Sequence, residues 1–450
     1  ANYNNLLYAY MKVHQLTCGI LLAIALFCNC SYLNMTTHRA ILRVSNSLNP
    51  SLSAAKVLNP EKTFTVYGQL KLRERRTIPM VITAISHKYG KQEIVSSYYI
   101  SGEGYFSLYL PEGIYSIVIL VDLNKDSLFN AQECIGYYKD DSYFTVNPKF
   151  ARSGIISGLQ LLANPLRPFS LNNPIQLHYP LSFNAEPTHN SPPGSIRQLN
   201  DTLFSPSMSE TGIYKPDIFL AISGIYFYAL KEEDANKIPL IMIHGYGGSP
   251  RDFEHIVKSI DTSTFSLWFF YYPSGQSLEK TAAIFYEIFL SNRIIHYKPQ
   301  GITILAHSMG GLVARRALNI LSQSNTRIPS IEYISLSSPY GGNEEADEGL
   351  RVAPVTIESW KELASKSNFI KKLNEDKLDK KIRFHLIFGY KMESNESESS
   401  DGSVVLKSQL HYPAQKIATT FTGFNETHRS ILSSPDVFEK INSILNTKHP

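Results

Sequence analysis

Short, wholly apolar runs alternate with helix-forming stretches over the second half of the chain. Residues 239–243 and 302–305 are rich in Ile, Leu and Met, with few polar side chains. Such runs predict strands that are buried on both faces, as in a parallel sheet. Strand-type sequence occurs again at 383–388 and 416–421, and helix-forming sequence lies between the runs. This alternation favours an α/β fold with a doubly wound sheet.

The first half of the chain shows a different pattern, in which short strand-type runs are separated by Gly and Pro-Glu-Gly turns. Regular short strands with turn signals predict an antiparallel β-sandwich of about a hundred residues. The runs are residues 64–67, 80–84, 96–100, 105–110 and 114–121.

A chain of 450 residues is long enough for two or three domains. Residues 217–230 are apolar and aromatic, and we expect them to form early strands or a helix that leads into the second sheet. The predicted order is a signal peptide or N-terminal extension (1–30), a polar tether (31–60), the β-sandwich (61–163), a Pro/Ser-rich linker and lead-in (164–236) and a catalytic domain (237–450).

Ser308 lies where the run 302–305 passes into helical sequence, with Ala306 two residues before it and Gly310 two residues after it. Small residues at these places allow the tight strand-to-helix turn that lifts a nucleophilic serine above a sheet edge. The N-terminus of the following helix, near Met309, would point at the same spot and could stabilise an oxyanion. The alternative is an ordinary turn that contains a serine.

The run 239–243 ends in His244-Gly-Tyr-Gly-Gly. Glycines there would let the backbone approach a substrate oxygen closely. We predict an oxyanion hole made by the backbone N–H groups of Tyr246 and Met309. His244 precedes the serine, so we interpret it as a structural brace for the loop rather than as a proton carrier.

The remaining catalytic groups are expected after Ser308, in the order acid and then histidine. Asp401 follows the strand-type run 383–388 and heads a turn, while Glu393, Glu396 and Glu398 compete from a polar run. His428 follows the last strand-type run at a helix entrance, which suits the base. His411 and His449 fit this order less well, because one precedes that run and the other lies at the chain's end.

With these residues in place, residues 238–445 resemble the α/β-hydrolase fold, and within it bacterial lipases and esterases and the lipase-like GPI inositol-deacylases. The resemblance rests on residues 244–253, 271–275, 306–318, 335–342 and 401–405. Tyr340 departs from this pattern, since the family commonly has His there. Residues 102–126 in turn resemble transthyretin-like or carboxypeptidase-regulatory-like sandwiches, which usually bind or space rather than catalyse.

The resemblance implies a serine ester hydrolase in which Ser308 attacks, His428 transfers the proton and Asp401 orients the imidazole. No cofactor is required, and the expected partner is a hydrophobic ester or lipid, with association at a membrane surface. The alternatives are an acyltransferase or peptidase on the same triad, and a surface binding protein whose hydrolase scaffold is inactive.

Residues 345–377 interrupt the strand-type sequence with charged, helical text. Many hydrolases carry a cap over the site at this place, and an apolar cap would favour acyl-chain substrates. A helix that packs on the sheet is the alternative. The apolar residues that such a cap would present are Val352, Val355, Ile357 and Trp360.

The net charge of +4 is small for this length and argues against nucleic acid as a main partner. Met11 and Lys12 precede an apolar run of about thirteen residues, which is shorter than the roughly twenty needed for a membrane span. We therefore expect a secretory signal peptide and an exported protein, secreted or attached to the envelope; an uncleaved anchor is the alternative. Cys28 or Cys30 could carry a lipid. Excluding this region leaves Cys134 alone, so no internal disulfide framework is predicted.

Residues Asp122 to Glu133 carry oxygen-bearing side chains at the spacing of a helix-flanked calcium loop. Ser127 stands where that loop needs glycine, and the flanks are strand-type. The segment is therefore either a calcium site or a solvated acidic hairpin. The oxygen ligands would be Asp122, Asn124, Asp126, Asn130 and Glu133.

Overall fold

The computed structural model describes most of the chain from Thr63 to Asn446. The described residues are 63–73, 80–88, 91–100, 102–124, 126, 128–129, 131–141, 143–147, 154–163, 175–176, 195–223, 226–231, 234–291, 294, 299–353, 356–391 and 399–446. The predicted signal region, the tether, Cys28 and Cys30 lie outside them, as do Val355, the three competing glutamates at 393, 396 and 398, and His449.

Two sheets form the N-terminal β-rich region, and their inner faces share one apolar cluster that includes Val66, Ile82, Phe106 and Ile119. Each predicted strand-type run lies within a strand. One sheet has the order β4-β1-β9, with β1 (Thr63–Leu72), β4 (Gly104–Pro111) and β9 (Ile155–Ala163). The other contains β2 (Met80–Lys88), β3 (Lys91–Ile100), β5 (Gly113–Val121), β7 (Cys134–Tyr137) and β8 (Phe144–Val146).

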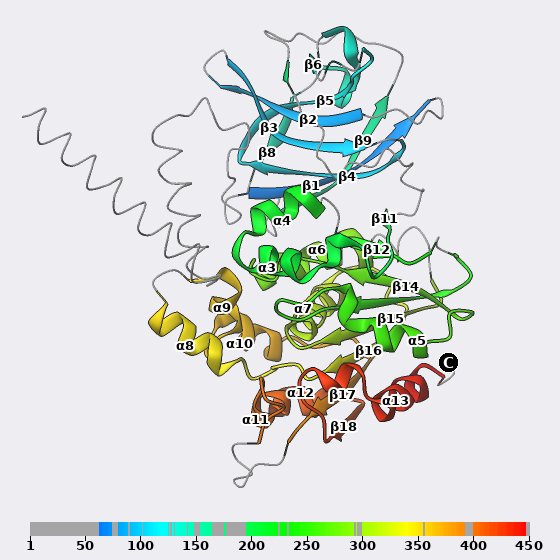
Figure 1. Cartoon of the computed structure of the whole chain (residues 1–450), viewed down its shortest axis with the longest axis vertical. Helices are drawn as coiled ribbons and strands as arrows, with labels where there is room; N and C mark the ends of the chain where they lie inside the picture. Colours follow the sequence, from blue (N-terminus) through cyan, green and yellow to red (C-terminus); the bar gives the residue numbers. More distant parts are fainter. Residues whose placement is uncertain are drawn as a thin grey trace, which may run out of the picture. The chain divides into compact units, whose positions relative to one another are not determined.

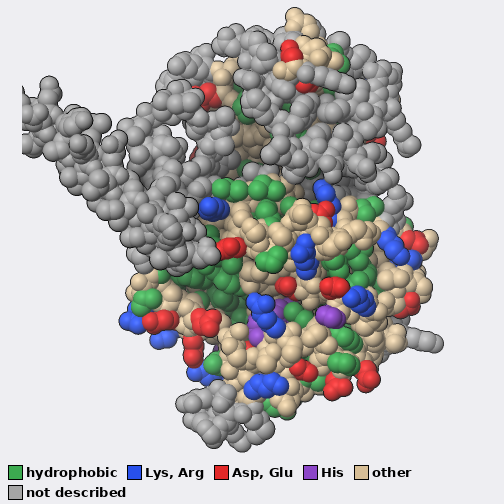
Figure 2. Space-filling model, in the orientation of Figure 1, with side chains coloured by type: hydrophobic (Ala, Val, Ile, Leu, Met, Phe, Trp, Pro, Cys, Tyr) green, Lys and Arg blue, Asp and Glu red, His purple; other side chains and the backbone are tan. Residues whose placement is uncertain are grey.

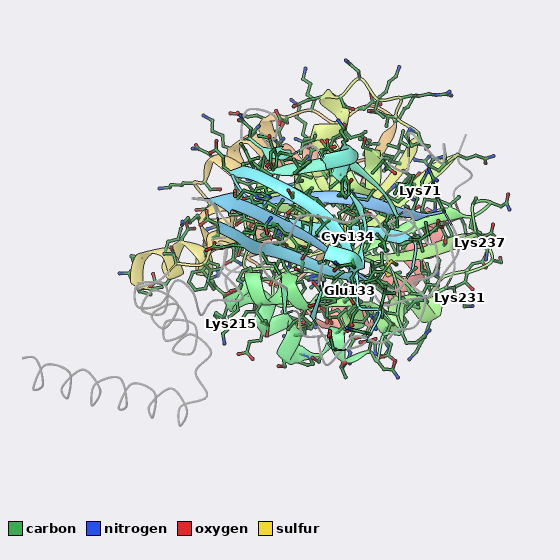
Figure 3. All side chains as sticks on the ribbon, turned by 90° about the horizontal axis from the view of Figure 1, so that it is seen from above. Lys71, Glu133, Cys134, Lys215, Lys231 and Lys237 are labelled. Atoms are coloured by element: carbon green, nitrogen blue, oxygen red, sulfur yellow. The ribbon has the colours of Figure 1, made fainter. Side chains whose placement is uncertain are left out.

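Cys134 begins β7, beside Glu133 (Figure 3); its side chain is fully buried and its thiol donates to Gly136 O at 3.4 Å. The acidic segment before it connects β5 to β6 (Leu128–Phe129) and the 3-10 helix η2 (Ala131–Glu133). The predicted calcium loop therefore follows a strand, β5, and not the helix that precedes a helix-flanked calcium loop.

The second half is built on a sheet with the order β11-β12-β14-β13-β15-β16-β17-β18, in which only the β12–β14 pair is antiparallel (Figure 1). The predicted α/β fold class is confirmed. The strands are β11 (Ser195–Ile196), β12 (Phe227–Ala229), β13 (Ile238–Ile243), β14 (Phe265–Phe270), β15 (Gly301–His307), β16 (Ser330–Leu336), β17 (Ile382–Gly389) and β18 (Thr420–Phe424).

Helices cover both faces of this sheet (Figure 1). One face packs against α6 (Leu278–Ile284), the π-helix η6 (Phe285–Ser291), α7 (Met309–Gln323) and α10 (Asn368–Glu375), and the other against α5 (Glu254–Ser259) and α13 (Pro435–Leu445). The remaining helices are α3 (Pro206–Tyr214), α4 (Pro216–Ser223), α8 (Glu344–Val352), α9 (Glu358–Leu363), α11 (Leu406–Gln409) and α12 (Tyr412–Ile417).

One predicted strand begins later than expected. The last strand was expected from residue 416, but Lys416 and Ile417 end helix α12, and β18 begins at Thr420. Pro413 lies in the first turn of that helix, where its missing N–H loses no hydrogen bond. The helix is therefore compatible with the proline, and the strand begins only after it. The apolar segment 217–230 forms both expected alternatives, helix α4 followed by strand β12.

The strand order reverses direction at β13. The chain moves from β13 outward to β14, and then β15 pairs on the other side of β13. Loops leaving the carboxyl ends of β13 and β15 therefore diverge, and a crevice at such a switch point is where open α/β sheets bind ligands. In this protein the two loops carry residues 244–249 and Ser308.

Candidate active site

Ser308 is the single residue between β15 and α7, and its backbone has φ of 54° and ψ of −129°. A positive φ is uncommon for a residue with a side chain, and it marks the strained turn of a nucleophile elbow. The turn is fixed by the Ser308 N–H, which donates to Leu336 O at 2.8 Å, and by the Gly311 N–H, which donates to Ser308 O at 2.9 Å.

Three predicted side chains meet at this turn. His428 Nε2 lies 2.8 Å from Ser308 Oγ, and His428 Nδ1 lies 2.7 Å from Asp401 Oδ2. Since a carboxylate only accepts, Nδ1 carries the proton and Nε2 is left to accept from the serine hydroxyl. The three groups come from loops after β15, β17 and β18, whose carboxyl ends lie at one edge of the sheet.

Asp401 is held as an acceptor by its own turn. Its Oδ1 accepts from the backbone N–H groups of Ser403 at 3.0 Å and Val404 at 2.7 Å. Burial would raise the pKa of Asp401, but the His428 bond and these N–H donors outweigh it and hold the pKa below its usual range. His428 N–H also donates to Asp401 O at 2.8 Å, which fixes the two loops together.

The loop after β13 lies against the nucleophile. A Cβ added at Gly245 would come 2.8 Å from Ser308 Cβ, so only glycine fits there. Gly247 N–H donates to Ser274 Oγ at 3.0 Å. Across the described residues, neither the Tyr246 N–H nor the Met309 N–H has a hydrogen-bond acceptor, which leaves both predicted oxyanion donors available to a ligand.

His244 braces this loop, as its place before the serine predicted. It is fully buried, its Nδ1 lies 2.7 Å from Gly245 O, and its Nε2 accepts from Tyr272 N–H at 3.2 Å. Its ring stacks on Tyr272 with centroids 4.3 Å apart. Burial lowers the pKa of His244 to about 4, so the ring stays neutral at ordinary pH.

His307 is a part of the site that sequence reasoning did not assign. Its Nε2 lies 2.8 Å from His428 O, and the two imidazole rings are 4.7 Å apart. Burial, reinforced by the nearby charge of His428, lowers the pKa of His307 to about 3. The neutral ring can therefore donate to the His428 carbonyl, and its place beside Ser308 was the only signal in the sequence.

Tyr340 stands where the resembling family commonly has His, and its side chain is fully buried. Its hydroxyl lies 2.7 Å from Tyr333 OH and 2.8 Å from Ser335 Oγ. The substitution therefore supplies a hydrogen-bonded support beneath the strand end, and the triad is left intact.

Of the other histidines considered for the base, His411 lies at the start of α12. Glu393, Glu396 and Glu398 lie outside the described residues, so their alternative as the acid stays untested.

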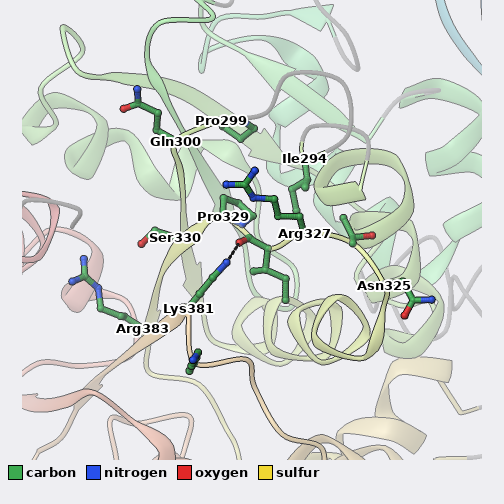
Figure 4. A pocket seen from close by; sticks show the side chains of 12 residues that line it. Ile294, Pro299, Gln300, Asn325, Arg327, Pro329, Ser330, Lys381 and Arg383 are labelled. Carbon is green, nitrogen blue, oxygen red and sulfur yellow. Dashed lines mark hydrogen bonds between the residues drawn. The ribbon is translucent and has the colours of Figure 1, made fainter.

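A cavity of about 1030 Å³ lies away from this site, at the edge where β15, β16 and β17 begin (Figure 4). Four cationic side chains line it, and Lys381 Nζ donates to Ile328 O at 3.1 Å within it. Because the loops that carry Ser308, Asp401 and His428 leave the opposite edge of the sheet, this cavity is not the candidate active site. The cations are Arg327, Lys380, Lys381 and Arg383.

Within the described part of the chain, no group of three or more His, Cys, Asp or Glu side chains is arranged to hold a metal ion. In the predicted calcium loop, Glu133 Oε1 accepts from Leu123 N–H at 3.2 Å, and Asp122 Oδ1 accepts from Asp126 N–H at 3.1 Å. Asn130 lies outside the described residues, and calcium binding stays a prediction.

Residues 233–400 match the protein family described as "Putative serine esterase (DUF676)". The match spans the loop after β13 and Ser308, and it ends before Asp401 and His428. It does not reach the β-rich region, whose resemblance to transthyretin-like or carboxypeptidase-regulatory-like sandwiches stays a prediction. No curated protein sequence matches the chain.

Solved structures of several bacterial proteins are similar to this chain. The lipase BlEst2 of Bacillus licheniformis, in its mature form, is 18% identical with a TM-score of 0.40, over 49% of this chain and 98% of that one. The product of the gene lin2722 of Listeria innocua is 14% identical with a TM-score of 0.37, over 48% and 96%. Phospholipase PlaB of Legionella pneumophila is 16% identical with a TM-score of 0.32, over 38% and 45%.

Proposed function

We propose that this protein is a serine carboxylic-ester hydrolase of the lipase and esterase type. The observation that carries the proposal is the continuous chain of hydrogen bonds from Ser308 Oγ through His428 to Asp401. The match of residues 233–400 to a serine esterase family supports the same chemistry.

In the proposed reaction, Ser308 Oγ attacks the ester carbonyl carbon while His428 Nε2 takes the hydroxyl proton. Asp401 stabilises the imidazolium that forms. The carbonyl oxygen becomes an oxyanion, to which the backbone N–H groups of Tyr246 and Met309 donate. His428 then gives the proton to the leaving alcohol, and a water molecule repeats the sequence to free the acid.

The substrate we propose is an ester of a hydrophobic acyl group. Tyr246, on the loop beside Ser308, is 36% exposed, and its hydroxyl accepts from the indole N–H of Trp360 on α9. On the face drawn in Figure 2, hydrophobic side chains gather between the places of α3 and α9, while charges of both signs are scattered elsewhere. An apolar surface of this kind suits the hydrocarbon of an acyl chain better than it suits a charged substrate group.

Activity against p-nitrophenyl esters of increasing chain length tests the proposal, with and without calcium. Ser308→Ala should abolish hydrolysis and labelling by a fluorophosphonate while keeping the wild-type thermal transition, because the hydroxyl contributes little packing. A Ser308→Ala protein that keeps more than about a tenth of the activity would remove Ser308 from its role.

Labelling of Ser308 without ester turnover would favour the acyltransferase or peptidase alternatives. Absence of labelling in the folded wild-type protein would favour the inactive binding scaffold.

A further inference from the structure

We propose that the hydrogen bond between Trp360 and Tyr246 positions the oxyanion loop, which makes Trp360 a positioning residue for ester hydrolysis. Trp360 Nε1–H donates to Tyr246 OH at 3.1 Å and joins helix α9 to the loop after β13. The inference rests on the proposed function, because it gives the Tyr246 backbone N–H the role of an oxyanion donor.

Trp360 is well placed to fix another residue, because helix α9 is itself fixed to the loop that follows β14. The Ser359 N–H donates to Gly275 O at 3.3 Å. The Glu362 carboxylate accepts from Ser277 Oγ at 3.1 Å and from the N–H of Leu278, at the start of α6. Trp360 therefore projects from a helix that is anchored on both sides of it.

Helix α8 also confines the Trp360 ring. A Cβ added at Gly349 of α8 would come 2.9 Å from the ring's Cε3 atom. Helix α8 thus packs against the indole and limits its rotation. A donor held this firmly loses little further freedom when it makes a hydrogen bond.

The loop that receives this bond is fixed before and after Tyr246, but less so at Tyr246 itself. Gly245 lies against Ser308, and the Gly247 N–H donates to Ser274 Oγ at 3.0 Å. In the described structure Tyr246 N–H has no acceptor, and its side chain is 36% exposed. The tryptophan bond therefore restrains the one residue of the loop whose N–H must meet the oxyanion.

An oxyanion donor must lie about 2.7–3.1 Å from the position that the oxygen takes in the transition state. A loose Tyr246 would weaken that bond without altering ground-state binding. Loss of the tryptophan bond is therefore expected to lower kcat about three- to tenfold and to leave KM unchanged, as for one neutral hydrogen bond acting in the transition state.

Two conservative variants of the full-length protein test this inference. Tyr246→Phe removes the hydroxyl acceptor, and Trp360→Phe removes the N–H donor while retaining an aromatic ring. Each single variant and the double variant should show the same loss of kcat on p-nitrophenyl butyrate, because either change breaks the same bond. Inactivation by a p-nitrophenyl phosphonate, which resembles the transition state, should slow by the same factor.

Tyr143→Phe is the matched control, since Tyr143 is 60% exposed in the β-rich region. It should leave kcat and KM unchanged. Unchanged kcat in both single variants would overturn the inference, as would losses that multiply in the double variant or a change confined to KM. If Trp360→Phe fails to fold, Tyr246→Phe alone decides.

A failure of the proposed function would look different. Ser308→Ala would then retain turnover, or wild-type protein would not react with the phosphonate at all. Failure of the inference alone leaves Ser308 reactive and the wild-type enzyme active.

Discussion

At the scale of single residues, Asp401 is fixed by the turn that it heads. Its carboxylate accepts from Ser403, Val404 and His428, and its backbone carbonyl accepts from the His428 N–H. An amide in its place could present an NH₂ group to Nδ1 and favour the wrong imidazole tautomer. Replacement of Asp401 by Asn would therefore remove the negative charge from the site while keeping the shape of the side chain.

Asp401→Asn should lower kcat on the order of a thousandfold or more, while the thermal transition stays close to wild type. Glu398→Gln, from the competing polar run, should be nearly silent in the same assay. Equal losses in the two variants, or the reverse order, would move the catalytic acid upstream into that run.

His307 should act on the base through its backbone. His307→Leu removes the donor to His428 O and is expected to lower kcat about ten- to a hundredfold by misplacing the imidazole. His307→Gln keeps an Nε2 donor and should recover part of that loss. Equal activity in the two variants, with unchanged melting temperatures, would contradict a positioning role.

The sequence predicted Ser308, Asp401 and His428 as a set because each follows a local rule. Ser308 lies between small residues in a strand-to-helix turn, Asp401 begins a turn, and His428 lies in the loop after the last strand. His307 and Trp360 obey no such rule. Their partners are 121 and 114 residues away along the chain, so only the folded sheet brings them together. Local rules identified the candidate reacting groups, while the groups that contact them depend on long-range packing.

At the scale of elements, helix α9 is attached to α6 through a buried carboxyl group. Burial raises the pKa of Glu362 from 4.5 to about 7, although Leu278 N–H, Ser277 Oγ and Glu279 N–H donate to it. The nearby Glu279 carboxylate adds to the rise. Because the folded state favours the protonated form, this contribution to stability is complete below pH 4.5 and is lost as the pH rises through about 7.

Glu362→Gln should therefore flatten the pH dependence of stability. Wild-type protein is expected to lose stability between about pH 4.5 and pH 7 through this group, while the variant, which cannot ionise there, should not. Urea unfolding at pH 5 and pH 8 measures the difference. Glu375→Gln, whose side chain is 66% exposed, is the control and should keep the wild-type dependence.

Element boundaries were less predictable than element types. The buried strands at β13, β15 and β17 were evident from their apolar runs, and the helical text after residue 345 forms α8, α9 and α10. Strand β11 could not be separated from the predicted linker, since it spans two residues and forms by pairing with β12, whereas β12 lies inside the segment 217–230 that was expected to form strands or a helix. Strands that short carry no periodicity of their own.

At the scale of the whole molecule, export stays a prediction from the sequence. In the part of the chain that the structure describes, no helix is both long and apolar enough to cross a membrane. We expect a producing cell to export the protein and to leave a mature chain that begins near residues 28–32, free or lipidated on Cys28 or Cys30. N-terminal sequencing and intact mass of the native protein measure this. A cytosolic chain that retains Met11 would contradict it.

Residues 195–205 pack into the second half of the molecule and therefore belong to the smallest part expected to be active. Arg251 Nε–H donates to Leu199 O at 2.9 Å, and β11 pairs with β12. Phe204 is fully buried, with ring centroids 5.1 Å from Tyr228 and 5.3 Å from Tyr271. This segment is therefore part of the core around the eight-stranded sheet, although the sequence placed it in a linker and lead-in segment.

A protein of residues 195–450 should fold and hydrolyse p-nitrophenyl acetate, because every candidate catalytic group is retained. A protein of residues 210–450 lacks Phe204, strand β11 and the first residues of α3, and should be less stable by at least the ~3–5 kcal/mol that loss of one buried phenylalanine side chain usually costs. Urea unfolding and kcat/KM of the two proteins measure this. A folded but inactive 195–450 protein would show that catalysis requires the β-rich region, and equal stability of the two would contradict the role of Phe204.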